Sequence, residues 1–161
     1  MLAVTVGWMS AAHADDPELV PCADAIGTFL TENANADETD WFASRSLISL
    51  TDAGHAFFTD SGEAGGPDFA PFTDGSGAWR CDSAADGTQQ ITATIVDFVF
   101  PQGDTGRKIG RLDIAGAFDP RTGLLSGTMT LYIVPFESNP MTTTDEPTAA
   151  GKFRGFKITA P

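Results

Sequence analysis

The sequence has few basic residues, and those it has are unevenly placed. Nine Lys and Arg residues stand against 22 Asp and Glu residues, which gives a net charge of −13 at pH 7. Residues 1–86 carry 15 acidic residues and two basic ones, Arg45 and Arg80, whereas residues 87–161 carry seven of each. Such an acidic surface repels the phosphates of nucleic acids and anionic lipid head groups. We therefore expect no nucleic-acid partner.

Histidine and cysteine are also scarce, with two residues of each. This scarcity argues against a zinc or other transition-metal site, which needs a cluster of such ligands. A Ser or Cys catalytic triad would have to use His55 as its base, but His55 follows a turn and is expected to be an exposed residue at a strand start. No phosphate-binding Gly-rich loop or dinucleotide fingerprint is present. We predict no cofactor and can name no catalytic residue.

Calcium is the one metal for which the loops offer carboxylates, although none has the EF-hand spacing. The candidates are Asp82 and Asp86, or Asp37, Glu38 and Asp40. We predict no metal site.

Long apolar runs are absent, and the longest at the N-terminus, residues 2–9, is too short to span a bilayer. The small-x-small pattern Ala12-His13-Ala14, followed by Asp15, is typical of a signal-peptidase site. We predict that residues 1–14 are a truncated signal peptide, which lacks the basic region at its N-terminal end. Residues 15–161 are expected to form a single domain that is secreted or periplasmic. The alternative is a cytoplasmic N-terminal extension.

The two cysteines, Cys22 and Cys81, both lie in the proposed exported chain. An even count in an exported protein predicts one disulfide, which would join the segment before the first strand to the fourth strand. The alternative is a pair of buried free thiols.

What the sequence has in quantity is strand signals. Runs rich in β-branched and aromatic residues are separated by Gly, Pro and Asp turns. The predicted strands cover residues 27–31, 45–51, 55–60, 77–83, 90–100, 111–118, 124–134 and 152–159. Short turns join most of them, residues 61–76 form one long connection, and residues 33–40 are expected to be a loop. This order predicts an all-β, eight-stranded antiparallel up-and-down barrel with a short N-terminal extension, because closure removes exposed strand edges.

Alternation predicts which side chains face inward. Those of the two strands over residues 111–134 are Leu112, Ile114, Phe118, Leu125, Met129, Leu131 and Ile133. The run over residues 90–100 is apolar on both faces, so its inward face stays open. Gly116, Gly127 and Gly155 lie within strand patterns, where glycine marks a bulge, a bend or a close backbone approach.

Several short patterns together resemble a largely uncharacterised group of small exported bacterial proteins with lipocalin-like (calycin-type) barrels. They include Asp52-Ala-Gly54, Gly77-Ala-Trp79 and Ser126-Gly-Thr128, and the similarity covers residues 27–159. The resemblance implies the barrel and supplies no catalytic signature, so no functional residue is transferred. At the level of fold alone, the chain is similar to the barrels of allene oxide cyclases and related cyclases, and fold does not imply function.

An eight-stranded barrel is either filled by side chains or just wide enough for one small ligand. The candidate ligand-binding residues are aromatic or polar strand residues: Phe29, Phe57, Arg80, Thr94, Phe98, Phe100, Tyr132 and Phe156. Asp97 is a further polar candidate, and Phe69 and Phe72 in the long connection would form either a lid over one mouth or a plug in it. The alternative is that the aromatic residues fill the core and the polar ones face solvent.

The leading hypothesis is an exported barrel that binds a small apolar molecule in its interior. A cyclase or isomerase that acts by holding a reactive apolar substrate in one conformation is the alternative, because orientation alone lowers reaction barriers. A structural or surface-interaction module is the third possibility. The oligomeric state and the ligand are not encoded in any pattern that we recognise.

Overall fold

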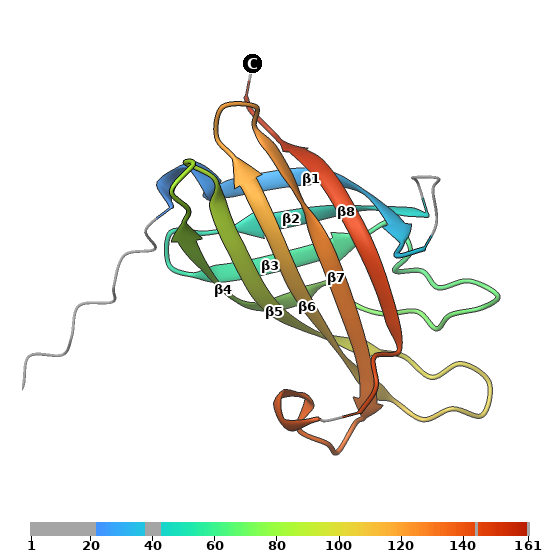
Figure 1. Cartoon of the computed structure of the whole chain (residues 1–161). Coiled ribbons are helices and arrows are strands. Elements are labelled where there is room, and N and C mark those ends of the chain that lie inside the picture. The colour runs from blue at the N-terminus through green and yellow to red at the C-terminus, as the bar shows by residue number, and fades with distance from the viewer. Residues whose placement is uncertain (1–21, 38–42, 144, 161) are drawn as a thin grey trace, which may run out of the picture.

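The chain folds into a closed antiparallel barrel (Figure 1). The computed structural model describes residues 22–37, 43–143 and 145–160, so the predicted signal peptide lies outside the described residues. Each strand pairs with its neighbours in the chain, and β8 pairs with β1. The strands are β1 (Gly27–Asn35), β2 (Ser44–Leu50), β3 (His55–Asp60), β4 (Gly75–Ser83), β5 (Gln89–Val99), β6 (Lys108–Asp119), β7 (Leu124–Pro135) and β8 (Ala149–Lys157). The predicted eight-stranded up-and-down barrel is confirmed.

The two helical elements are single 3₁₀ turns, η1 (Ala23–Ala25) and η2 (Pro140–Thr142). No helix in the described residues has the length and apolar character needed to cross a membrane.

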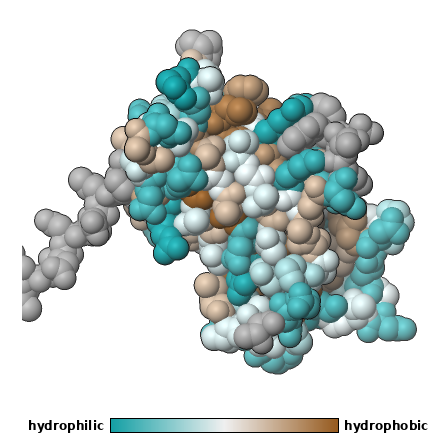
Figure 2. Space-filling view, in the orientation of Figure 1, coloured by the Kyte–Doolittle hydropathy of each residue, from teal (hydrophilic) through white to brown (hydrophobic). Residues whose placement is uncertain are grey.

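Strand alternation divides the side chains between the barrel interior and its surface. In β5, Ile91, Ile95, Asp97 and Val99 are buried, whereas Phe98 is exposed, which settles the face that the sequence left open. Of the residues predicted to face inward in β6 and β7, Ile114, Phe118, Leu125 and Met129 are buried, whereas Leu112, Leu131 and Ile133 are half-buried. Val134, on the opposite face of β7, is also buried. Figure 2 shows the resulting outer surface, on which hydrophilic and apolar side chains are mixed.

Glycines allow the strands to approach one another closely where the barrel curves. Gly116 of β6 pairs directly with Gly127 of β7. A Cβ atom at Gly127 would overlap the carbonyl oxygen of Ala115, and one at Gly155 would overlap that of Leu30. The close approaches predicted at these glycines are therefore present.

The connections at the two ends of the barrel differ in length. Residues 51–54, 84–88 and 120–123 form short turns at one end, which we call the sealed end. The longer connections, which follow β1, β3, β5 and β7, begin at the opposite end, which we call the open end (Figure 1). This asymmetry decides where a ligand can enter.

The N-terminal segment and a disulfide close the sealed end. Cys22 bonds to Cys81 of β4 with a Cα–Cα distance of 6.1 Å, as predicted, and Cys22 is fully buried. Next to them in the hydrophobic core, the rings of Phe29 and Phe118 meet edge to face at 5.4 Å. Large apolar side chains therefore fill this half of the barrel.

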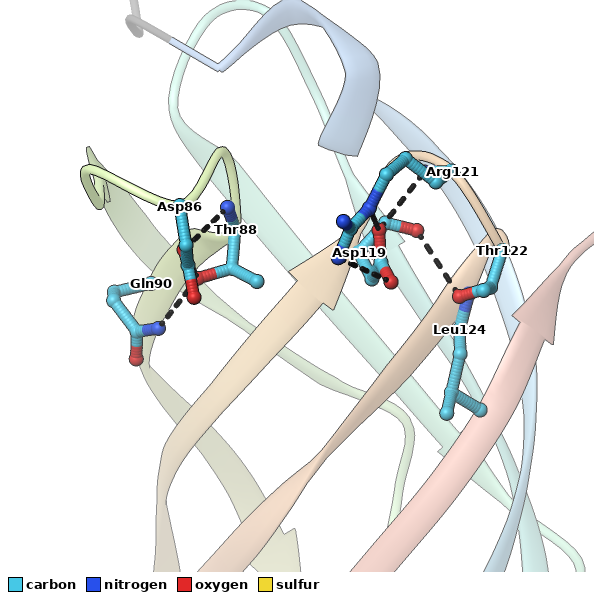
Figure 3. A network of polar contacts seen from close by, with 7 residues as sticks. All are labelled: Asp86, Thr88, Gln90, Asp119, Arg121, Thr122 and Leu124. Carbon is cyan, nitrogen blue, oxygen red and sulfur yellow. Dashed lines mark hydrogen bonds and ion pairs between the residues drawn. The ribbon is translucent and has the colours of Figure 1, made fainter.

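Two hairpin turns at the sealed end are held by local polar contacts (Figure 3). The carboxylate of Asp119 accepts hydrogen bonds from the backbone and the guanidinium of Arg121, which lowers the pKa of Asp119. In the neighbouring turn, the side-chain and backbone donors of Thr88 lower the pKa of Asp86, and the charge of Arg121 adds to this effect. Each turn is thus stabilised by residues only a few positions apart in the chain. Turns of this kind can be recognised from local sequence.

Candidate functional site

The open end of the barrel contains a cavity of about 740 Å³. Residues of every strand except β4 line it, and the large apolar ones in the strands are Phe58, Val99, Leu112, Leu131 and Ile133. The interior is therefore filled at the sealed end and hollow at the open end.

The long connection between β3 and β4 forms one wall of this cavity. Phe69 and Phe72 both line it, and Phe72 forms an isolated β-bridge with Val99. The Phe100 backbone N–H donates to the Pro71 carbonyl oxygen at 2.8 Å, which attaches the connection to the end of β5. Phe69 is 48% exposed, so it lies at the rim of the cavity and does not plug the core.

A polar network lies between the core and the cavity. Asn33, Ser44 and Ser46 donate hydrogen bonds to Oδ2 of Asp60 at 3.1, 2.8 and 2.6 Å. The backbone N–H of Gly62 donates to Oδ1 of the same carboxylate at 2.7 Å. Both oxygens of Asp60, which lines the cavity, therefore have partners within the protein.

Asp97 is the second carboxylate on the cavity wall, and it is less well satisfied. The residue is 9% exposed, and its Oδ1 is buried without a hydrogen-bond partner. The carboxyl lies over Gly110 of β6, where a Cβ atom would overlap Oδ1. Burial raises the pKa of Asp97 to about 6, a backbone hydrogen bond from Gly110 acts in the opposite direction, and the charge of Glu63 raises it further. A carboxyl with such a pKa can exchange a proton near neutral pH.

The connection between β3 and β4 carries further acidic groups, Glu63 and Asp74. Glu63 accepts a hydrogen bond from the Asp60 backbone N–H at 2.9 Å. The pKa of Glu63 is raised by its burial and by the hydrogen bond and charge of Asp74, although the Asp60 backbone bond opposes this. Lys108 is the basic residue among the described residues that line the cavity.

Of the eight predicted ligand-binding residues, Phe100 lines the cavity and Phe29 lies deeper, in the filled half of the core. Phe57, Phe98 and Phe156 are 48%, 53% and 62% exposed on the outer face. Figure 2 shows apolar surface near the C-terminal end of β8, the strand that carries Phe156.

The three polar candidates make contacts with neighbouring strands. Arg80 Nε donates to the Thr92 hydroxyl at 2.9 Å, and the Thr94 hydroxyl donates to Asp113 at 3.0 Å. The guanidinium of Arg111 stacks on the ring of Tyr132 at 4.2 Å. Arg80, Thr94 and Tyr132 are not among the residues that line the cavity.

Sequence reasoning named Asp97 as a polar candidate but did not identify Asp60 or Lys108. Asp97 was a candidate only as a polar residue in a strand, and its inward orientation follows from the burial pattern of β5. The position of Asp60 depends on hydrogen bonds to β1 and β2, which no local pattern reveals.

In residues 22–37, 43–143 and 145–160, no three His, Cys, Asp or Glu side chains are grouped so that they could hold a metal ion. Asp86 of the predicted calcium alternatives accepts hydrogen bonds from Thr88, and Glu38 and Asp40 lie outside the described residues.

The fold and cavity define the class of the protein: a closed eight-stranded antiparallel barrel, compatible with a lipocalin-like architecture, with one sealed end and one open end. No family model, curated protein or solved structure matches the chain.

Proposed function

We propose that this protein binds a small, largely apolar molecule in the cavity at the open end of the barrel. The observation that supports this proposal is the cavity of about 740 Å³, whose wall combines aromatic and aliphatic side chains with polar and charged ones. Small-molecule sites in proteins are typically clefts of about 300–1,000 Å³ with this kind of lining. The long connections around the mouth give such a molecule a route of entry.

The expected affinity is moderate. Ligands of drug-like size gain about −0.3 kcal/mol per non-hydrogen atom. A ligand of about 20 such atoms would therefore bind with about −6 kcal/mol, which corresponds to a dissociation constant of tens of micromolar. Binding assays should cover that concentration range.

The test uses N-phenyl-1-naphthylamine, an uncharged probe whose fluorescence rises in apolar surroundings. Leu131→Trp places a bulky ring in the cavity, whereas Phe57→Trp makes a similar change on the exposed outer face. We expect the first variant to lose at least about tenfold in affinity and the second to bind as the unmodified protein does. Ile133→Trp serves as a second cavity variant if Leu131→Trp does not fold. Unchanged binding by a folded cavity variant would contradict the proposal.

We also propose that the protein is exported, with residues 1–14 as the signal peptide and residues 15–161 as the mature domain. The Cys22–Cys81 disulfide supports this, because such bonds persist in oxidising compartments. The intact mass of the protein isolated from its own host tests both points. A mass that includes residues 1–14 would refute the cleavage.

A second candidate function is an enzyme that cyclises or isomerises the bound apolar molecule. Asp97 favours it, because a carboxyl with a pKa of about 6 on an apolar cavity wall can act as a general acid or base near neutral pH. Mass spectrometry of molecules extracted from the host protein and from an Asp97→Asn variant distinguishes the two functions. An unconverted molecule accumulating in the variant indicates catalysis, whereas the same molecule in both indicates binding alone.

A further inference from the structure

The chemistry of the cavity wall narrows the class of ligand. We propose that the ligand is an apolar amine: a hydrophobic body with one protonated amino group, which binds at the Asp97 carboxylate. This inference rests on the proposed function, since it assigns the ligand of the same cavity.

Asp97 is a buried carboxylate on the cavity wall. The residue is 9% exposed, it lines the cavity, and Oδ1 has no hydrogen-bond partner. The backbone hydrogen bond from Gly110 offsets only part of the cost of burying this carboxylate, since its pKa stays raised, and a donor supplied by a ligand would relieve more of that cost. Asp60 differs, because protein groups already donate to both of its oxygens. The unmet demand for a donor is therefore at Asp97.

Most of the charged residues that line the cavity are acidic. Of the described lining residues, Asp60, Asp68 and Asp97 are acidic, and Lys108 is basic. Glu63 lies close enough to Asp97 for its charge to raise the Asp97 pKa. A cavity lined mainly by one sign of charge concentrates ligands of the opposite sign. An anionic ligand would face three carboxylates, whereas a cation is attracted to them.

Aromatic rings also line the cavity. Phe58, Phe69, Phe72 and Phe100 line the cavity along with the carboxylates. Their rings offer contact area to a hydrophobic body, and ring faces also attract ammonium groups. A neutral alcohol would gain the apolar contact and the hydrogen bond but not the charge interactions. The combination of rings and carboxylates fits an amine best.

The test compares three probes that share one ring system: 1-naphthylmethylamine, which is cationic at pH 7.5, 1-naphthylmethanol, which is neutral, and 1-naphthoate, which is anionic. Affinities are measured calorimetrically on the full protein. We expect the amine to bind at least about tenfold more tightly than the alcohol, and the acid to bind most weakly. Asp97→Asn should abolish the preference for the amine. Asp82→Asn, which removes an exposed carboxylate of β4 outside the cavity lining, should preserve it.

A pH series on the unmodified protein provides a second measurement if Asp97→Asn does not fold. With an Asp97 pKa of about 6, the affinity for the amine should fall about tenfold between pH 7.5 and pH 5, while that for the alcohol stays constant. Protonation of Glu63, whose pKa is also raised, changes the affinity in the same direction. Asp60, Asp68 and Lys108 are the other charged groups among the described residues that line the cavity.

Each remaining outcome is decisive. Equal affinities for the three probes, with no effect of Asp97→Asn, would overturn the amine assignment and leave the proposed binding function standing. Tightest binding of the acid would assign the ligand to Lys108 and would also overturn it. Failure of all three probes to bind would overturn both the assignment and the proposed function.

Discussion

Replacing Asp97 with Asn should stabilise the empty protein at neutral pH. The pKa of Asp97 is raised from its ordinary value of 3.8 to about 6, mainly by burial. Between these two values the folded state holds a proton that the unfolded state has lost, so stability falls as pH rises through this window. Above pH 6 the folded protein carries the full cost of a buried carboxylate, and an uncharged amide of the same shape removes it.

The magnitude follows from the size of the shift. Each pKa unit corresponds to about 1.4 kcal/mol, so a shift of about two units gives an upper limit of about 3 kcal/mol. Water in the open cavity screens the carboxylate, and the measured gain should therefore be about 1–3 kcal/mol at pH 7.5. At pH 4, where Asp97 is protonated in the folded state, the gain should vanish.

Urea denaturation at pH 4 and pH 7.5 measures both quantities, with Asp82→Asn as a control that removes an exposed carboxylate. An Asp97→Asn protein that is less stable than the parent at pH 7.5, or equally stabilised at both pH values, would refute the reasoning. The first result would mean that the carboxylate is satisfied in the folded state.

Three further predictions concern the scaffold. Replacing Cys22 and Cys81 with Ser should lower the free energy of unfolding by about 4 kcal/mol for a sequence separation of 59, as measured by urea denaturation. Gly127→Ala should destabilise the barrel by more than about 2 kcal/mol in the same assay, because its Cβ would overlap a backbone carbonyl. Gly106→Ala, at a site with open space, should change stability by less than about 1 kcal/mol. Phe118→Ala should cost about 3–5 kcal/mol and lower the thermal midpoint, since it empties a filled part of the core.

The strands could be predicted from the sequence because their signals are local. Alternating side chains and Gly, Pro or Asp turns lie within a few residues of one another, and most boundaries fall close to the predicted ones. β1 is an exception, since it continues to Asn35 into a segment expected to be a loop. Asn33 and Ala34 pair with Phe153 and Lys152 of β8, and no local pattern reveals so distant a partner.

The cavity was harder to predict, because aromatic content does not identify the inward face. Phe98 and Val99 are both good strand residues, yet only the closed register of the barrel places Val99 on the cavity wall and Phe98 in solvent. The connection over residues 61–74 has no periodicity, so its role as a cavity wall depends on contacts with the end of β5. Register and long-range contacts are properties of the whole barrel.

The placement of the chain ends has a practical consequence. Lys157 Nζ donates to the carbonyl oxygen of Asp24 at 2.9 Å, so the first and last described segments meet at the sealed end. A sensor surface, bead or fusion partner attached beyond residue 160 would therefore hold the barrel with its mouth facing outward. Immobilised in this way, the protein would keep its entrance free for sampling the surrounding fluid, which makes capture of ligands directly from host culture medium a feasible experiment.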